Sequence, residues 1–166
     1  MMHNTHFAQY IPPTAMHYVT GTYTEVAGEE AGTIAINRAA NNGTALITIP
    51  VMVPSNSVAL QGVKLASIEI DYEHFTAEPT SMTWVLNKVT RGADAAVAVV
   101  APVTKTNTLS AATGKTVNEH REVITLTTPA WISNEEYYLL QLSMPSGAGG
   151  HTFHMLGAVA NFTFKG

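Results

Sequence analysis

The stretch that decides the fold is Val63–Phe75, which reads VKLASIEIDYEHF. In its second half, Ile68, Ile70 and Tyr72 alternate with the acidic residues Glu69, Asp71 and Glu73. Successive side chains of a β-strand point to opposite faces of a sheet, so this pattern predicts a strand with one buried and one solvated face. The same period of two returns in Met82–Asn87 and in Tyr138–Met144. The chain is therefore predicted to be all-β.

Turn signals separate these candidate strands at short intervals. They include Asn41-Asn42-Gly43, Glu78-Pro79-Thr80 and Arg91-Gly92-Ala93-Asp94. The spacing predicts about eight to ten strands, as in sandwiches and barrels. No repeat of fixed period is present, which argues against a propeller or a β-helix. We predict a jelly-roll-like antiparallel β-sandwich with an extended N-terminal arm.

Several segments carry more specific expectations. His17–Val26 is expected to be one strand, and Pro50 should place the strand Thr44–Val53 at a sheet edge or bulge it, because proline cannot donate to a ladder. Lys105–Asn118 is polar and is expected to form a long loop or an irregular hairpin tip. His151–Lys165 is expected to close the fold. Its predicted apolar face consists of Leu156, Ala158, Ala160, Phe162 and Phe164.

Residues 1–16 are predicted to form the arm, and residues 17–166 a single β-sandwich domain. Ile11-Pro12-Pro13 favours extended backbone, because proline fixes φ and restricts the residue before it. One interpretation is an arm that docks on a neighbouring subunit, and the other is a frayed terminus. The candidate interaction residues of the arm are Phe7, Tyr10, Ile11, Pro12 and Pro13.

The composition excludes several classes of function. The chain has 166 residues and a net charge of −4, with only 8 Lys plus Arg, so a nucleic-acid partner is not expected. No apolar run reaches the roughly 20 residues of a membrane helix, and the N-terminus lacks the pattern of a signal peptide. The absence of cysteine excludes disulfides and Cys-based zinc sites. Charged residues make up only 12%, which leaves a surface open to association or simply rich in threonine.

No catalytic constellation emerges, and we predict a non-enzymatic protein without cofactor or metal. There is no Gly-x-Ser-x-Gly elbow and no phosphate-binding loop. His151 and His154 have i, i+3 spacing, which places them on opposite faces of a strand and makes them a poor chelate. A small β-barrel isomerase that uses His120 or His154 with a glutamate remains the enzymatic alternative.

Two further groups of side chains have two interpretations each. Glu69, Asp71 and Glu73 share one face of a strand, where they could hold Ca²⁺ or form a solvated face, and the solvated face is favoured. Trp84 and Trp131 could stack on sugars, but their apolar neighbours indicate core positions.

As a whole, the sequence resembles structural β-sandwich modules of bacteriophage virions. The likeness lies in Thr48–Gly62, in Val63–Phe75 and in Thr128–Leu142, followed by the closing strand. It implies a jelly-roll-like fold, assembly as a homotrimer and location in the virion after synthesis in the host cytoplasm. It further implies a capsid decoration or cement subunit that binds the major capsid protein or another virion protein. No functional residues can be transferred, because such modules share no catalytic motif.

The alternative function is a tail-fibre receptor-binding module or a carbohydrate-binding module. Such a module would bind its ligand with loops at one end of the sandwich. The candidate loops are Lys105–Asn118 and Ser146–Gly150.

Overall fold

The structure is a computed structural model that describes residues 4–28, 31–41, 43–52, 62–92, 98–133, 135–145 and 151–165. Within these ranges it contains twelve strands, one 3₁₀ turn and no α-helix. The elements are β1 (Asn4–Ile11), η1 (Pro13–Ala15), β2 (His17–Thr20), β3 (Tyr23–Ala27), β4 (Ile34–Asn41), β5 (Ala45–Val51), β6 (Val63–His74), β7 (Thr83–Thr90), β8 (Val99–Pro102), β9 (Lys105–Asn107), β10 (Glu119–Leu126), β11 (Glu136–Met144) and β12 (His151–Lys165).

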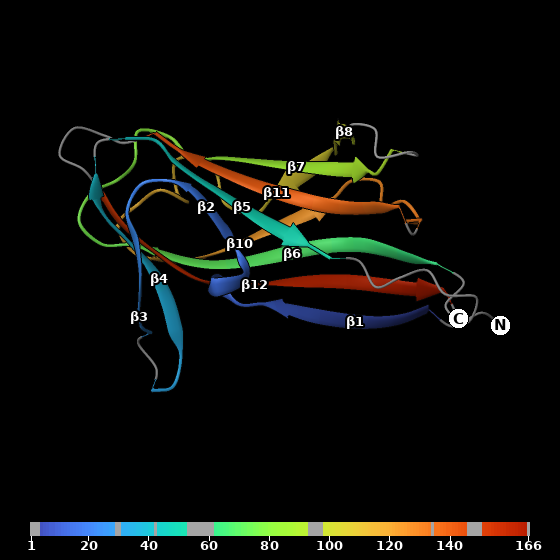
Figure 1. The fold of residues 1–166 in the computed structure, drawn as a ribbon, viewed down its shortest axis with the longest axis horizontal. Coiled ribbons are helices and arrows are strands. Elements are labelled where there is room, and N and C mark those ends of the chain that lie inside the picture. Colours follow the sequence, from blue (N-terminus) through green and yellow to red (C-terminus); the bar gives the residue numbers. More distant parts are fainter. Residues whose placement is uncertain are drawn as a thin grey trace.

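The strands form two antiparallel sheets that pack face to face (Figure 1). Sheet A has the order β3-β4-β12-β6-β10-β9, and β1 also pairs with β12. Sheet B has the order β2-β5-β11-β7-β8. Strands β4 and β1 share one edge of β12, because β4 pairs with its first half and β1 with its second half.

This topology is a jelly roll. The eight strands β4, β5, β6, β7, β8, β10, β11 and β12 can be numbered one to eight in chain order. Sheet A then reads 1-8-3-6 and sheet B reads 2-7-4-5, which is the strand order of two interlocked Greek keys. The predicted jelly-roll-like sandwich is thus confirmed, with β1, β2 and β3 added at sheet edges.

The core lies between the sheets and is built by the alternation seen in the sequence. Ile68, Ile70 and Tyr72 of β6 are fully buried, and so are Leu140 and Leu142 of β11. Their chain neighbours on the other face remain at least partly exposed. Burying one such apolar side chain contributes about 1.5–3 kcal/mol, so the two buried faces favour this register over a slip by one residue.

The N-terminal segment is extended, and it lies on the sheet of its own chain. Residues 4–11 pair antiparallel with β12 over their whole length, from Asn4↔Lys165 to Ile11↔Ala158. The first described residues therefore lie beside the last ones (Figure 1). Docking of this segment on a neighbouring subunit stays a prediction.

One segment prediction needs correction, and another is decided between its two alternatives. The expected single strand at His17–Val26 is divided at Gly21, whose φ is 109°, so that β2 joins sheet B and β3 joins sheet A. Of the two alternatives for Lys105–Asn118, the structure agrees with the irregular hairpin, because Lys105–Asn107 form strand β9, which pairs with β10 at the edge of sheet A, and residues 108–118 connect the two strands. Local polarity could not reveal this pairing, because β9 is only three residues long and depends on β10.

Pro50 lies in an inner strand, but at a place where that strand is locally an edge. On one side β5 pairs with β11 through Leu139↔Pro50 without a shift in register. On the other side its described pairing with β2 reaches only to His17↔Thr48. The missing N–H of Pro50 is tolerated where β2 no longer pairs.

The predicted apolar face of β12 is correct for Ala158, Ala160 and Phe162, which are buried, and wrong for Leu156. Leu156 is an extra residue in a β-bulge, because Met155 pairs with Tyr72 and Gly157 with Asp71. The bulge reverses the alternation, so that Phe153 and Met155 are buried before it.

Candidate functional site

The outer face of sheet A carries a transverse row of three positions at the β12 bulge. Gly157 of β12 lies opposite Asp71 of β6, and Asp71 lies opposite Arg121 of β10. Arg121 donates two hydrogen bonds to Asp71, from Nε to Oδ1 at 2.7 Å and from Nη2 to Oδ2 at 3.0 Å. Such a bidentate pair fixes the plane of both groups. The Asp71 contact is also the largest cause of the raised pKa of Arg121.

The ring of Tyr10, on β1, is held against the first position of this row. A Cβ atom at Gly157 would lie 2.7 Å from the Tyr10 hydroxyl and 2.9 Å from Cε2, so only glycine allows the ring to lie here. The φ of 144° at Gly157 is also one that glycine adopts most readily. The Tyr10 hydroxyl donates a hydrogen bond to the carbonyl of Leu156 at 3.3 Å, and the side chain is 60% exposed.

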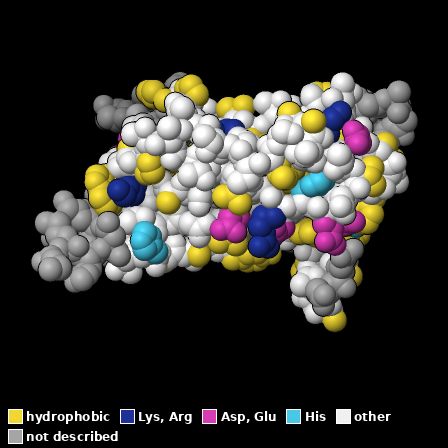
Figure 2. Space-filling view, turned by 180° about the vertical axis from the view of Figure 1, so that it is seen from behind, with side chains coloured by type: hydrophobic (Ala, Val, Ile, Leu, Met, Phe, Trp, Pro, Cys, Tyr) yellow, Lys and Arg dark blue, Asp and Glu magenta, His cyan; other side chains and the backbone are white. Residues whose placement is uncertain are grey.

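These side chains line a groove of about 530 Å³. Thr33 and Ile34, at the β3–β4 hairpin, contribute to its wall, and Glu119 also lines it. The hairpin projects from the body of the sandwich (Figures 1 and 2). The groove combines an exposed aromatic ring, an apolar wall and paired hydrogen-bonding groups, which is the composition of a small-molecule site.

A second cluster lies within sheet A and contains three histidines and an arginine. One of them, His120, is only partly buried and also lines the groove. The ring centroid of His74 lies 5.8 Å from that of His151 and 6.1 Å from that of His120. The Nη1 atom of Arg38 lies 3.5 Å from Nε2 of His151, and Arg38, His74 and His151 are fully buried. Burial, reinforced by His151 and His120, lowers the pKa of His74 to about 3, although the Gly114 carbonyl acts in the opposite direction. Burial and the Arg38 charge lower the pKa of His151 to about 4.

This histidine cluster lacks the arrangement of a metal centre. Among the described residues, no group of three or more His, Asp or Glu side chains is arranged to hold a metal ion. His154, the other half of the predicted i, i+3 pair, is partly exposed on the opposite face. The predicted poor chelate is consistent with this placement.

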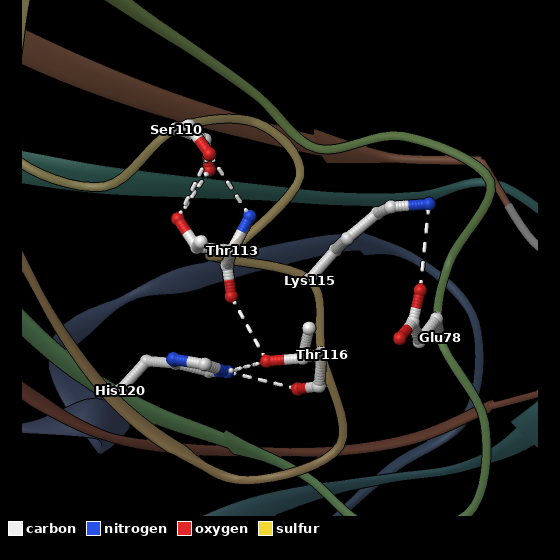
Figure 3. A network of polar contacts seen from close by, with 6 residues as sticks. All are labelled: Glu78, Ser110, Thr113, Lys115, Thr116 and His120. Atoms are coloured by element: carbon white, nitrogen blue, oxygen red, sulfur yellow. Dashed lines mark hydrogen bonds and ion pairs between the residues drawn. The ribbon is translucent and has the colours of Figure 1, made fainter.

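The loop 108–118 joins β9 to β10 and is held by polar contacts within the chain. Figure 3 shows part of this network, which runs through Ser110, Thr113, Thr116 and His120. The backbone N–H groups of Thr108 and Leu109 and the Thr108 hydroxyl donate to one carboxylate oxygen of the buried Glu122. Tyr72 donates to the carbonyl of Gly114 at 2.8 Å. Lys115 forms an ion pair with Glu78 at 3.5 Å. This arrangement anchors the loop.

A small cavity of about 220 Å³ lies under this loop, lined by Trp84, Lys105 and Glu122 among others. Burial lowers the pKa of Lys105 and the charge of Glu122 opposes that shift. The other predicted ligand loop, 146–150, lies outside the described residues. The described loop presents no exposed aromatic side chain, so it gives the predicted recognition function no direct support.

The outer face of sheet B differs from that of sheet A in charge. Three rows cross its central strands, and they hold Pro50, Leu139 and Asn87, then Thr48, Gln141 and Val85, then Leu46, Ser143 and Thr83. All nine side chains are at least partly exposed, and none is ionisable. The corresponding face of sheet A carries Glu69, Asp71, Glu73, Glu119 and Arg121. We call the nine positions the uncharged face.

The predicted arm residues have different environments. Phe7 stacks on Phe162 and Phe164, with ring centroids 4.9 and 4.3 Å apart. Ile11 and Pro13 are buried, whereas Pro12 is exposed and Tyr10 lines the groove. Within the described residues, Phe7 and Ile11 thus hold this segment against its own sandwich.

The two tryptophans and the carboxylates of β6 are the remaining candidate residues. Trp84 is a core residue, as predicted, but the prediction for Trp131 is wrong, since it is 43% exposed. It lies over Lys64, whose Nζ atom is 4.6 Å from the ring centroid. The carboxylates of β6 have partners in the protein, because Asp71 binds Arg121 and Glu69 accepts from Asn161 at 2.9 Å.

Sequence reasoning named Tyr10 and Asp71 but did not bring them together with Arg121 and Gly157. The glycine inside the closing strand was the available signal, because an isolated glycine in a strand marks a bulge or a close approach.

Comparison with known proteins gives similarities of fold only. No protein family and no curated protein matches the sequence. Among solved structures, the chain is similar to an arabinose-bound α-L-arabinofuranosidase (9% identity, TM-score 0.42), covering 92% of this chain but only 24% of that one. It is also similar to a family 35 carbohydrate-binding module from Clostridium thermocellum (12% identity, TM-score 0.39, 94% and 97% covered). A family 11 carbohydrate-binding module from the same organism, in complex with a mixed-linked tetrasaccharide, gives 8% identity and a TM-score of 0.39, with 98% and 88% covered.

The described residues contain no helix with the length and hydropathy needed to span a membrane.

Proposed function

We propose that this protein is a non-enzymatic structural subunit of a virion, of the capsid decoration or cement type, which associates with copies of itself. The observation that carries the proposal is the uncharged face of sheet B. The resemblance of the sequence to bacteriophage virion modules is the reason for proposing a virion. Besides further copies of this chain, the proposed partner is the major capsid protein or another virion protein.

The uncharged face suits burial against another protein. Removing a charge from water costs several kcal/mol unless it is paired, and the cores of protein interfaces are depleted in charge. Leu46, Val85 and Leu139 offer apolar area, while Thr48 and Gln141 offer hydrogen bonds. The chain has 20 charged residues (8 Lys plus Arg and 12 Asp plus Glu), yet none lies at these nine positions.

The size of the face indicates how the contact would extend. Three strands about 4.8 Å apart and five residues long, at about 3.3 Å per residue, present roughly 240 Å², whereas a standard interface buries about 800 Å² on each partner. The neighbouring edge strand β8 extends the face without adding charge, since Pro102 pairs with Asn87 and Val100 with Val89. Val100, which lies on this face, is 58% exposed. On the other side, β2 contributes His17, which pairs with Thr48.

A second copy of this chain is the occupant we propose for the face, in a homotrimer as the resemblance implies. A surface without charge is matched by another such surface, and the described part of the chain offers the uncharged face and β8 as its charge-free candidates. Several subunits bound to one shell would hold by avidity even if each contact were weak.

Two threonine substitutions test the proposal. Thr83→Glu introduces a carboxylate at an exposed position of the uncharged face, and Thr125→Glu does the same on the outer face of sheet A. Light scattering coupled to size-exclusion chromatography should show that Thr83→Glu dissociates the oligomer, because an unpaired buried charge costs about 3–5 kcal/mol. Thr125→Glu should leave the mass of the wild type. Equal masses for both variants would contradict the role of sheet B.

A further inference from the structure

We propose that the groove on the outer face of sheet A binds a neutral glycan, with one pyranose ring stacked on Tyr10 and its hydroxyl groups bound by Asp71 and Arg121. This binding site goes beyond the proposed structural role. It lies on the sheet opposite the uncharged face, so that a subunit assembled through sheet B would keep it accessible.

The aromatic platform is the first element of the argument. Tyr10 is 60% exposed, but its position is fixed by the glycine beneath it and by its hydrogen bond to Leu156. An exposed aromatic ring with a fixed orientation is suited to the C–H face of a sugar, since the face of the ring is the negative part of its quadrupole and attracts the polarised C–H bonds. Little conformational entropy is lost on binding, because the ring is already ordered.

The polar row beside the platform is the second element. Gly157, under the ring, is followed across the sheet by Asp71 and then by Arg121. Adjacent strands lie about 4.8 Å apart, so the backbone of Asp71 lies one such step from Gly157. The Arg121 guanidinium reaches back to the Asp71 carboxylate at 2.7 Å, so the two groups offer acceptor and donor side by side. A carboxylate accepts from sugar hydroxyls, and a guanidinium donates to them. Vicinal hydroxyl groups can therefore bind the pair while the ring stacks on Tyr10.

Charge decides which glycans fit. The positive charge of Arg121 is already paired with Asp71, and Glu119 adds a negative charge to the lining. Glu69 also acts on Arg121. The surroundings of the row are thus neutral to acidic, which disfavours uronic or sialic acids. Figure 2 shows basic and acidic side chains gathered on this side of the molecule, close to the projecting hairpin.

The groove wall limits the ligand on one side. Ile34, 45% exposed, and Thr33 come from the β3–β4 hairpin, and Leu156 adds apolar surface at the bulge. A short stretch of a polysaccharide chain could rest against this wall, with one residue over Tyr10.

The test is a binding titration by saturation-transfer NMR with maltohexaose, mannohexaose and galactohexaose, and with oligogalacturonate as the acidic probe. We expect at least one neutral probe to bind and the acidic one to bind more weakly. Tyr10→Ala should weaken binding at least about fivefold, as expected for the loss of one aromatic stacking contact. Tyr10→Phe should stay within about threefold, because it keeps the ring.

Two controls separate this site from other surfaces. Arg121→Lys keeps the charge but loses the planar fork, and it should weaken binding. Trp131→Ala removes an exposed aromatic ring outside the groove, and it should leave binding unchanged. The proposal would be overturned if no neutral probe binds, if the acidic probe binds best, or if Tyr10→Ala and Trp131→Ala have equal effects. These outcomes are independent of the oligomeric state, which reports on sheet B.

Discussion

Acidification from pH 7 to pH 5 should destabilise this protein more than its carboxylates can explain. The reason is the buried pair His74 and His151, whose pKa values lie at about 3 and about 4 in the folded protein, against 6.5 for an exposed histidine. Both side chains are fully buried, and the neighbouring charge is that of Arg38. The third histidine of the cluster, His120, and the ring of Tyr72 pack against His74 without offering a carboxylate.

The direction follows from proton binding. Between the folded pKa values and 6.5, the unfolded chain protonates both histidines, whereas the folded protein keeps them neutral. The free energy of unfolding is therefore highest above pH 6.5 and falls as the pH decreases through this window. Each histidine that remains neutral in the folded protein lowers the free energy of unfolding by about 2 kcal/mol between pH 7 and pH 5. The pair should therefore lower it by about 4 kcal/mol. Glu136, whose pKa is lowered from 4.5, loses its contribution to stability mainly as the pH falls below 4.5, outside the interval from pH 7 to pH 5.

Urea unfolding at both pH values measures this difference. His74→Phe removes one titrating group while retaining a ring beside Tyr72 and Phe153, and its loss of stability between pH 7 and pH 5 should be about 2 kcal/mol. His6→Gln, at an exposed position of β1 on sheet A, is the matched control and should keep the wild-type difference. A wild-type difference below about 1 kcal/mol, or an unchanged difference in His74→Phe, would refute the reasoning.

Two further predictions concern stability. Trp84→Ala should lower the free energy of unfolding by about 3–5 kcal/mol, because its ring is in the core. Trp131→Ala should lower it by about 1 kcal/mol or less, because its ring lies over Lys64 at the surface. Equal losses of stability in urea unfolding would contradict these placements. Glu122→Gln should lower the free energy of unfolding by about 1–3 kcal/mol and speed amide hydrogen exchange in residues 108–118, since this buried carboxylate anchors the loop. Unchanged exchange at Thr108 and Leu109 would show that the carboxylate does not anchor the loop.

The architecture could be predicted from the sequence because each central strand buries one face. The alternation in Val63–Phe75 and Tyr138–Met144 defines the inner faces of β6 and β11, and the bounds of the closing strand agree with His151–Lys165. Short elements could not be predicted in this way. The strand β9 exists because β10 lies beside it, and no local pattern of three residues contains that information.

The candidate sites depend on long-range register, which explains why they were only partly foreseen. Tyr10, Asp71, Arg121 and Gly157 come from four strands, and only the pairing of β1 and β6 with β12, and of β10 with β6, brings them together. The bulge at Leu156 shifts the alternation by one residue, so a strict period of two fails there. Trp131 was misplaced because apolar neighbours in the chain do not imply apolar neighbours in space.

The most direct test of the proposed function is the mass of the purified wild-type protein, measured by light scattering during size-exclusion chromatography. The account predicts a stable oligomer, with a trimer at three times the 17.7 kDa mass of the subunit. A particle of 17.7 kDa at every concentration tested would contradict association through the uncharged face of sheet B.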